Sequence, residues 1–460
     1  YGHLNGLQGI YPPAKFEFRP YSMAGLTNYS DIRLTDYESP NSWGLNYTDH
    51  SKYNMGMDIQ YRVSTNAKLT FTINPDFGQV ESDPADINLT AYETYFQEKR
   101  LFFLNDIDIF ETPLEIFYSR RIGEKAWGAG KSTYLDTLRN NINQEDCILL
   151  GGNLVNNACI DTNFLYYNIP VIVKGAGKFA GKTESGLSYG LLGAITTFDD
   201  SSGWANQMQS SKNRNYFISR LKQDLLSGNS FIGLMTASSL ADSIHTVSLD
   251  GMANLFDNQI SVNGQILMTS DEHKGIYSSL SFSPLGYFSG WIDYYHYDKG
   301  LNLNDLGYLW RDNYTQAKLG LKFQSFEPWD MIRNTSVILE MDMEENTDGL
   351  DLGQTLELSY DFQFNNFWGM GGGFYKIIEH YDDRKIILDY SQNQFGPPIF
   401  IPEIMGSHFN ISTDKHRKFW AELSWTWASN SLNDAERGQY LELSYKPNSY
   451  LRFSTSYDRY

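Results

Sequence analysis

Apolar and polar residues alternate one by one along many short stretches of this chain. In the stretch 335–345, TSVILEMDMEE, one set of alternate positions is apolar and most of the other set is polar or acidic. The same pattern recurs at 317–324 (AKLGLKFQ), 354–364 (QTLELSYDFQF), 419–427 (FWAELSWTW) and 440–445 (YLELSY). A period of two residues places successive side chains on opposite faces of a β-strand. The pattern therefore predicts a protein built largely of strands.

Turn signals of two different kinds separate the predicted strands. Brief turns at 228–231, 257–259, 272–275 and 365–366 alternate with longer polar connections near 26–55, 199–213 and 299–313. Counting the alternating stretches gives about 16 to 20 strands, each of roughly 8 to 13 residues. Short turns at one end and long loops at the other are typical of an up-and-down meander.

The strand length and the repeat together favour one class of all-β fold. No run reaches the roughly 18 apolar residues that a membrane-spanning helix needs, so an α-helical membrane protein is excluded. Strands of about 10 residues with a two-residue repeat match a transmembrane β-barrel. A sheet that crosses lipid must close on itself, because lipid cannot hydrogen-bond to an open edge. We therefore predict an antiparallel up-and-down transmembrane β-barrel that forms a single domain over residues 1–460.

Composition narrows the function classes. Aromatic residues make up 15% of the chain, which distinguishes it from a disordered polypeptide. The net charge is −19, from 55 acidic and 36 basic residues, and this argues against nucleic acid as a partner. The expected partners are outer-membrane lipid, a glycan or small solute, and other envelope proteins. The run GMGGGF at 369–374 lacks the lysine of a phosphate-binding loop, and no cofactor is expected.

Two cysteines lie in one Asn- and Gly-rich segment, at Cys147 and Cys159. A close pair in a long chain favours a loop disulfide formed in an oxidising compartment. Two unrelated free thiols are the alternative.

If the apolar face of the strands meets lipid, the other face lines the lumen. That lining is charged at Lys318, Lys322, Glu340, Asp342, Glu344, Glu357 and Asp361. The two lysines are expected beside the acidic row of the next strand, where opposite charges support the register. The patch is read either as a solvated structural lining or as a surface that selects cations or guides a substrate.

The alternation is interrupted once, over 74–121. It is expected to resume near Leu114 in LEIFYSRRIG, and EKRLFFL (98–104) is a candidate for one crossing strand that the count otherwise lacks. Irregular backbone cannot face lipid, so the interruption is either an outside loop or a plug-like segment inside the lumen. Buried charges need partners, and the candidates for such pairing are Asp76, Glu81, Asp83, Asp86, Glu93, Glu98, Lys99, Arg100, Arg120 and Arg121.

The same interruption carries a family resemblance. NPDFGQVESDPADINLTAYETYFQEKRLFFLNDIDIF, followed by FYSRRIG and GKTESGLSYGLLGAIT, resembles a family of outer-membrane β-barrel proteins of unassigned function. In that family the barrel follows a domain similar to the family-nine carbohydrate-binding modules. The resemblance implies a Gram-negative outer-membrane location. The resemblance would place the end of that carbohydrate-binding-like domain at about Tyr1, just before the first barrel strand, so we expect residues 1–460 to contain the barrel without this domain.

The end of the sequence departs from the usual closing strand of such barrels. LRFSTSYDRY ends in Tyr460, but Ser456 and Asp458 occupy the alternate positions where apolar residues are usual. This leaves open that the chain is a fragment of a longer barrel.

The sequence does not contain the patterns of three kinds of catalytic or metal site. The acids of 81–86 lack the order of a calcium-binding loop, so no metal site is expected. With 55 acids the sequence does not nominate a glycosidase pair. The eight histidines are scattered and no serine has a nucleophile-elbow context. We therefore expect a non-enzymatic barrel, either a channel or the membrane anchor of a periplasmic glycan-binding domain. The alternatives are a surface enzyme acting on glycan or lipid, and a soluble all-β binding module.

Overall fold

The computed structural model describes most of the chain. The described residues are 14–33, 44–75, 88, 90–123, 126–127, 137–140, 152–155, 158–161, 168–169, 171–198, 215–240, 243–284, 286–389, 394–432 and 434–459.

Nineteen strands of the described chain form one antiparallel sheet. Its first half consists of β1 (Phe16–Arg33), β2 (Gly44–Ser64), β3 (Ala67–Ile73), β9 (Val171–Lys182), β10 (Leu187–Phe198), β11 (Asn215–Leu225), β12 (Ser230–Ser239), β13 (Ile244–Leu255) and β14 (Ile260–Thr269). Its second half consists of β15 (Lys274–Phe282), β16 (Phe288–Tyr297), β17 (Tyr314–Ser325), β18 (Ile332–Glu345), β19 (Asp351–Phe364), β20 (Gly369–Ile377), β25 (Ile404–Ser412), β26 (Phe419–Asn430), β27 (Ala435–Tyr445) and β28 (Phe453–Arg459).

The remaining elements are short. They are the helix α1 (Leu101–Leu104), the 3-10 turns η1 (Ile107–Ile109), η2 (Ser119–Arg121) and η4 (Leu226–Gly228), and small strand pairs outside the main sheet. These strands are β4 (Ala126–Trp127), β5 (Thr137–Asn140), β6 (Gly152–Val155), β7 (Ala158–Asp161), β8 (Asn168–Ile169), β21 (His380–Asp382), β22 (Ile387–Asp389), β23 (Gln394–Phe395) and β24 (Ile399–Ile401). No helix in the described part of the chain is long and apolar enough to cross a membrane.

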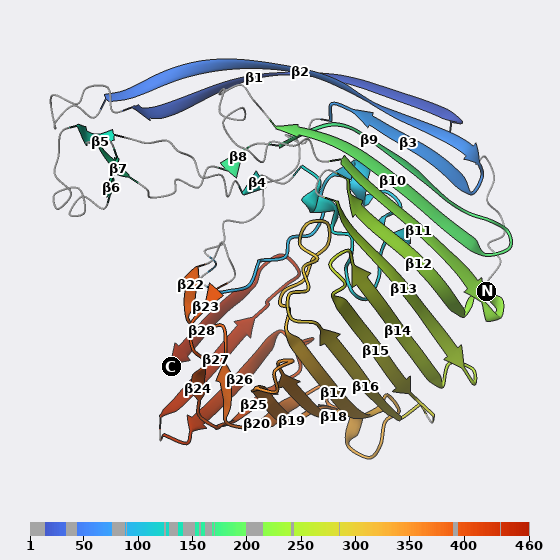
Figure 1. Ribbon diagram of the computed structural model, residues 1–460. Helices are drawn as coiled ribbons and strands as arrows, with labels where there is room; N and C mark the ends of the chain where they lie inside the picture. The colour runs from blue at the N-terminus through green and yellow to red at the C-terminus, as the bar shows by residue number, and fades with distance from the viewer. Residues whose placement is uncertain are drawn as a thin grey trace.

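Each strand of the main sheet pairs with its neighbour along the chain, except that β3 pairs with β9 and β20 with β25. The sheet curls round, and β1 and β28 are its two edges, with no pairing between them among the described strands (Figure 1). The longest connections all lie at one end of the strands, the long-loop end, and only shorter turns lie at the other end, the short-turn end. The predicted all-β, antiparallel up-and-down architecture is confirmed, and the strand number falls within the expected range.

The two faces of the sheet differ in the way the alternation predicted. In six neighbouring strands, β14 to β19, six apolar residues lie opposite one another in register and are all exposed, namely Val262, Leu280, Ile292, Leu319, Met341 and Leu356. A second exposed row crosses β11 to β14 through Leu221, Leu234, Leu249 and Ile266. The opposite face of β3 and β9 to β14 contains buried polar residues, including Thr72, Lys178, Arg220, Ser248, Asp250 and Gln265. The apolar face is therefore the outer one.

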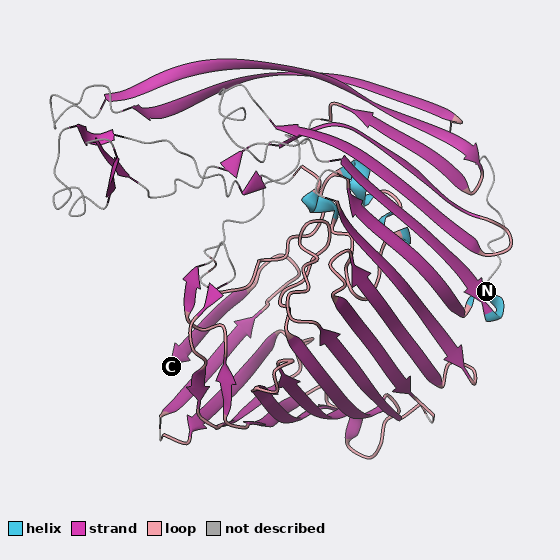
Figure 2. Ribbon diagram, in the orientation of Figure 1, coloured by secondary structure: helices cyan, strands magenta, loops and turns pink. Residues whose placement is uncertain are grey.

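The predicted interruption lies against this inner face. Residues 90–123, which we call the inner segment, contain α1, η1 and η2 and lie inside the curve of the sheet (Figures 1 and 2). Two expectations for it are wrong. EKRLFFL is not a crossing strand, because Leu101–Leu104 is helical, and the stretch after Leu114 is irregular rather than a strand. No further strand of the main sheet lies between β3 and β9 in the described chain, because these two strands pair directly with each other.

The connection expected at 26–55 is also mostly strand. The hairpin of β1 and β2 continues in register from the pair Phe16 and Tyr61 to the pair Arg33 and Gly44. Backbone pairing does not require one apolar face, so a polar sequence extended the hairpin where the pattern predicted a loop. The two strands project past the rest of the sheet in Figure 1.

Candidate functional site

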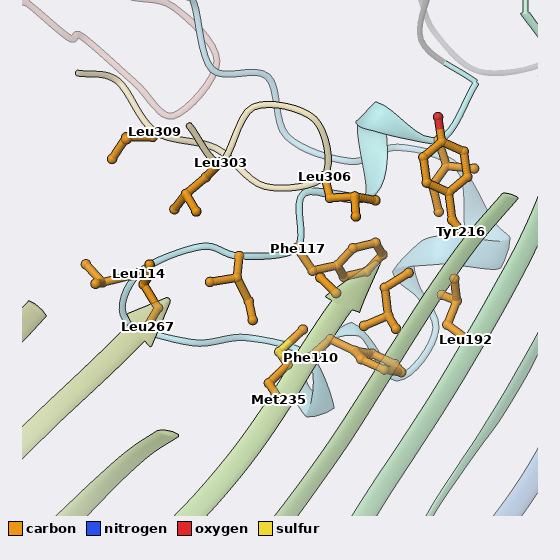
Figure 3. Close-up of a cluster of buried hydrophobic side chains, with 14 of the residues drawn as sticks. Phe110, Leu114, Phe117, Leu192, Tyr216, Met235, Leu267, Leu303, Leu306 and Leu309 are labelled. Carbon is orange, nitrogen blue, oxygen red and sulfur yellow. The ribbon is translucent and has the colours of Figure 1, made fainter. Parts of the chain in front are cut away.

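The inner segment is attached to the wall by a hydrophobic cluster at its centre. Phe110, Leu114 and Phe117 of the segment are buried against side chains of β10, β11, β12 and β14. Figure 3 shows these wall residues, which are Leu192, Tyr216, Met235 and Leu267. A third layer comes from residues 298–313, the connection between β16 and β17, which contribute Leu303, Leu306 and Leu309. The contact surface is apolar although the surrounding wall carries many polar side chains.

Two polar wall residues bind the backbone of the inner segment. Lys178 of β9 is 2% exposed, and its Nζ donates to the carbonyl of Phe102 at 2.7 Å and also to the carbonyl of Asn105. Gln265 of β14 accepts a hydrogen bond from the Leu114 amide at 2.5 Å, and its Nε2 donates to the Leu114 carbonyl at 3.2 Å. Buried polar groups that lack partners are costly. These contacts therefore fix where the segment sits.

The connection 298–313, which we call the clamp loop, holds the segment from the other side. The Tyr118 amide donates to the Leu306 carbonyl at 2.7 Å, and the Tyr308 amide donates to the Glu115 carbonyl at 2.9 Å. The rings of Tyr95, Tyr118 and Tyr308 pack together, with centroids 4.9 to 5.7 Å apart. The inner segment is thus enclosed between wall and clamp loop.

Charged residues of the interruption pair inside this assembly. Arg121, which is buried, donates from Nη1 and Nη2 to the two carboxylate oxygens of Glu93 at 2.8 and 2.7 Å. Arg100 makes the same fork with Glu98, from Nε at 2.9 Å and Nη2 at 2.7 Å. Arg100 also donates from Nη1 to the Ile122 carbonyl at 2.6 Å, so the start and end of the segment are tied together.

The other predicted charges of this stretch have different surroundings. Arg120 donates to the Gln97 carbonyl at 2.9 Å, and the Lys99 amide donates to Glu98. Four acids of the prediction, Asp76, Glu81, Asp83 and Asp86, lie outside the described residues. So does the proposed disulfide, because Cys147 and the side chain of Cys159 are not described.

Two carboxyl groups of the inner segment have shifted pKa values in opposite directions. Burial alone would raise the pKa of Glu98, but hydrogen bonds and charge from Arg100, with a hydrogen bond from Ser119, lower it below its usual range. Burial raises the pKa of Glu115 to about 7, and the hydrogen bond from Tyr95 Oη only partly opposes this. Glu115 therefore titrates near neutral pH within the contact to the clamp loop.

Charged residues also lie on β17, β18 and β19, in the second half of the sheet. Lys318 Nζ lies 3.2 Å from an Asp342 oxygen, and Gln316 Nε2 donates to Asp342 at 2.9 Å and to Glu344 at 3.0 Å. Lys322 lies opposite Ile338, which is two residues from Glu340 along β18. Asp361 lies opposite Gly371 of β20.

Glu340 and Glu357 form a contrasting pair among these charged residues. They lie directly opposite each other on β18 and β19. The described residues provide no ion pair for either carboxylate. Like charges that face each other across two strands are destabilising, so a cation near this pair would be stabilised.

Sequence reasoning missed a buried ion pair of the wall. Arg220 of β11 reaches across β12 to Asp250 of β13, and both side chains are 1% exposed. Its Nη2 donates to Asp250 at 2.6 Å, and Gly233 leaves the space for the guanidinium, since a Cβ there would meet Arg220 Nη1 at 2.6 Å. The alternation in FISRLKQDL predicts which face of the strand carries Arg220. It does not show which acidic residue the guanidinium pairs with.

It also missed the packing role of the clamp loop, because the pattern predicts only a polar connection there. The leucines at 301, 303, 306 and 309 are all buried, and they stand out in the otherwise polar stretch LNLNDLGYL. Apolar residues in a loop were the available signal.

The family model described as a domain of unknown function, DUF5916, matches residues 12–459. The chain belongs to the DUF5916 family. The predicted membership in a family of unassigned function is thereby confirmed, and the match covers the wall, the inner segment and the clamp loop of this DUF5916 chain. No curated protein matches it.

Solved structures similar to the DUF5916 chain include three proteins of Pseudomonas aeruginosa. OccK5 (OpdH) is 11% identical at a TM-score of 0.34, covering 63% of this chain and 88% of that one. OccK11 (OpdR) is 11% identical at 0.34, covering 65% and 87%. OpdK with vanillate is 10% identical at 0.33, covering 64% and 89%. These scores are too low to assign a function to the DUF5916 chain.

Proposed function

We propose that this chain forms the wall of an outer-membrane channel whose lumen is narrowed by the inner segment. The observation that carries the proposal is the exposed apolar outer face, with residues such as Leu249 and Ile266 51% and 57% exposed. Proteins in water rarely expose large contiguous apolar surfaces. A sheet with apolar residues outside and polar residues inside suits lipid on the outer face and water in the lumen.

The inner segment supplies the restriction. It lies against the inner face of β9 to β14 through the Phe110 cluster and is held in place by Lys178, Gln265 and the clamp loop. Among the basic wall residues of β9 to β14, Arg220 pairs with Asp250, Lys182 pairs with Asp224, and Lys178 donates to backbone carbonyls of the inner segment. These cations are therefore engaged by groups of the protein itself.

The lining of β18 and β19 supplies selectivity. Glu340 and Glu357 face each other there without an ion-paired partner among the described residues. A surface of one sign concentrates counter-ions next to it. We infer that the passage favours cationic solutes over anionic ones.

The first experiment tests the membrane wall and its restriction. The purified protein should require detergent, should migrate differently on gels before and after heating, and should give conductance in planar bilayers. A variant in which a short Gly-Ser linker replaces residues 76–105 should conduct more, because part of the obstruction is gone. Heat-modifiable migration of the variant reports that its sheet has formed. Unchanged conductance in a folded variant would contradict the plug role, and a chain that stays in solution without detergent would contradict the membrane wall.

The second experiment tests selectivity. In a KCl gradient, the double variant Glu340→Gln, Glu357→Gln should lower the preference for potassium over chloride, seen as a smaller reversal potential. Asp257→Asn is the matched control, because Asp257 is an exposed acid of the β13–β14 turn. A reversal potential that shifts equally in both variants would contradict a selective role for this pair.

Two further predictions remain for the chain. A barrel that anchors a periplasmic glycan-binding domain would have the same membrane wall. Binding of glycans to the purified protein tests this alternative. A surface enzyme would release product from glycan or lipid substrates, and product assays on the purified protein check this.

A further inference from the structure

A hollow of about 280 Å³ lies at the short-turn end of the lumen, away from the acidic lining. It is bounded by the β2–β3 turn at 64–66, by β9, and by Asp106 and Ile109 of the inner segment. Its volume corresponds to roughly nine water molecules at about 30 Å³ each. The space therefore suits a compact ion and is too small for an oligosaccharide.

Three basic side chains line this hollow: Arg62, Lys68 and Lys182. Their convergence follows from strand register. Arg62 of β2 lies opposite Lys68 of β3, and Lys68 lies opposite Ala180 of β9, two residues before Lys182. Positions two residues apart on a strand share a face. All three side chains therefore start from the inner face.

The charges of the hollow do not balance. Lys68 Nζ lies 2.8 Å from Asp106 Oδ2, and Lys182 Nζ lies 2.5 Å from Asp224 Oδ2. Arg62 has no ion pair with a described carboxylate. The half-buried Arg62 guanidinium leaves one positive charge uncompensated, and a guanidinium presents paired donors that match the geometry of an oxyanion.

We propose that this hollow binds a compact oxyanion, such as phosphate or a small carboxylate, with Arg62 as its main partner. Lys68 and Lys182 complete the site. Binding here does not depend on the cation passage, because the hollow is lined by β2, β3 and β9 and the passage by β18 and β19.

The site is linked to the inner segment through Asp106. This residue lies between α1 and η1, next to Asn105, whose carbonyl accepts a hydrogen bond from Lys178. A bound oxyanion competes with the Asp106 carboxylate for Lys68 and repels it electrostatically. The anion and the docked end of the inner segment therefore oppose each other.

Isothermal titration of the purified detergent-solubilised protein with inorganic phosphate at fixed ionic strength tests this site. Wild-type protein should bind saturably, and Arg62→Gln should weaken binding about tenfold or more. Lys222→Gln is the matched control, because Lys222 stacks over Phe231 outside the hollow and should leave binding unchanged. A parallel titration with succinate separates phosphate from carboxylate as the preferred anion.

Asp106→Asn distinguishes a binding role from a merely structural one. This variant removes the competing carboxylate, so it should bind phosphate more tightly than wild type even if it loosens the inner segment. Tighter binding supports the site. Equal binding in wild type and Arg62→Gln, no saturable heat with either anion, or weaker binding in Asp106→Asn would overturn it.

Discussion

Gly307 of the clamp loop lies where a side chain has no room. A Cβ built there would lie 2.3 Å from the Glu115 carbonyl oxygen and 2.9 Å from the Ile116 carbonyl carbon. Both obstacles are backbone atoms, so no side-chain rotation relieves the clash. We predict that Gly307→Ala separates the clamp loop from the inner segment.

The magnitude follows from the contacts at this point. The separation weakens the Tyr118 to Leu306 and Tyr308 to Glu115 hydrogen bonds, and the bond from Arg121 Nε to the Gly307 carbonyl at 3.0 Å. Each such bond contributes about 0.5–1.5 kcal/mol. Losing all three bonds would cost about 1.5–4.5 kcal/mol and overpacking adds about 1–3 kcal/mol, which gives an expected loss of about 2.5–7.5 kcal/mol in the free energy of docking.

Hydrogen–deuterium exchange of the peptide that contains Tyr118 measures this loss. A change of about 2 kcal/mol accelerates exchange by roughly 30-fold. Gly193→Ala is the control, because a Cβ there meets only the Tyr216 carbonyl oxygen, at 3.8 Å. Unchanged exchange in Gly307→Ala would refute the reasoning that the clamp loop holds the segment in place.

Three other changes test the remaining contacts of the inner segment. Glu93→Gln should lower the free energy of docking of the inner segment by about 1 kcal/mol, because Glu93 is 37% exposed and solvent screens its ion pair with Arg121. Hydrogen–deuterium exchange in the segment measures this loss, and a loss above about 3 kcal/mol would contradict the prediction. Lys178→Met should lower the free energy of unfolding by about 2–3 kcal/mol, because it leaves the buried carbonyl of Phe102 without its charged donor. A midpoint of thermal unfolding equal to that of the wild type would contradict this prediction. The pKa of Glu115 is raised from 4.5 to about 7, so the docked segment holds a proton that the undocked one releases, and docking weakens as pH rises through this window. Exchange corrected for intrinsic rates should therefore be faster at pH 8 than at pH 5, and Glu115→Gln should remove the difference.

The charge pairing within the inner segment was partly predictable. Acids and bases clustered in the stretch, and Glu93 and Glu98 indeed pair with Arg121 and Arg100. Which acid meets which base depends on how the segment folds back, because Arg121 and Glu93 are 28 positions apart. The inner segment has no two-residue alternation, so its sequence gives no strand register from which the ion-pair partners could be predicted.

The sequence by itself determined most of the strands and their alternating faces, because a two-residue period is a local property of the chain. Only the tertiary structure showed that Leu114 meets Gln265, 151 positions away, and that the clamp loop covers the inner segment. These contacts join irregular segments to a distant wall. Their geometry is set by packing and by the need to satisfy buried backbone groups, and neither leaves a periodic trace in the sequence.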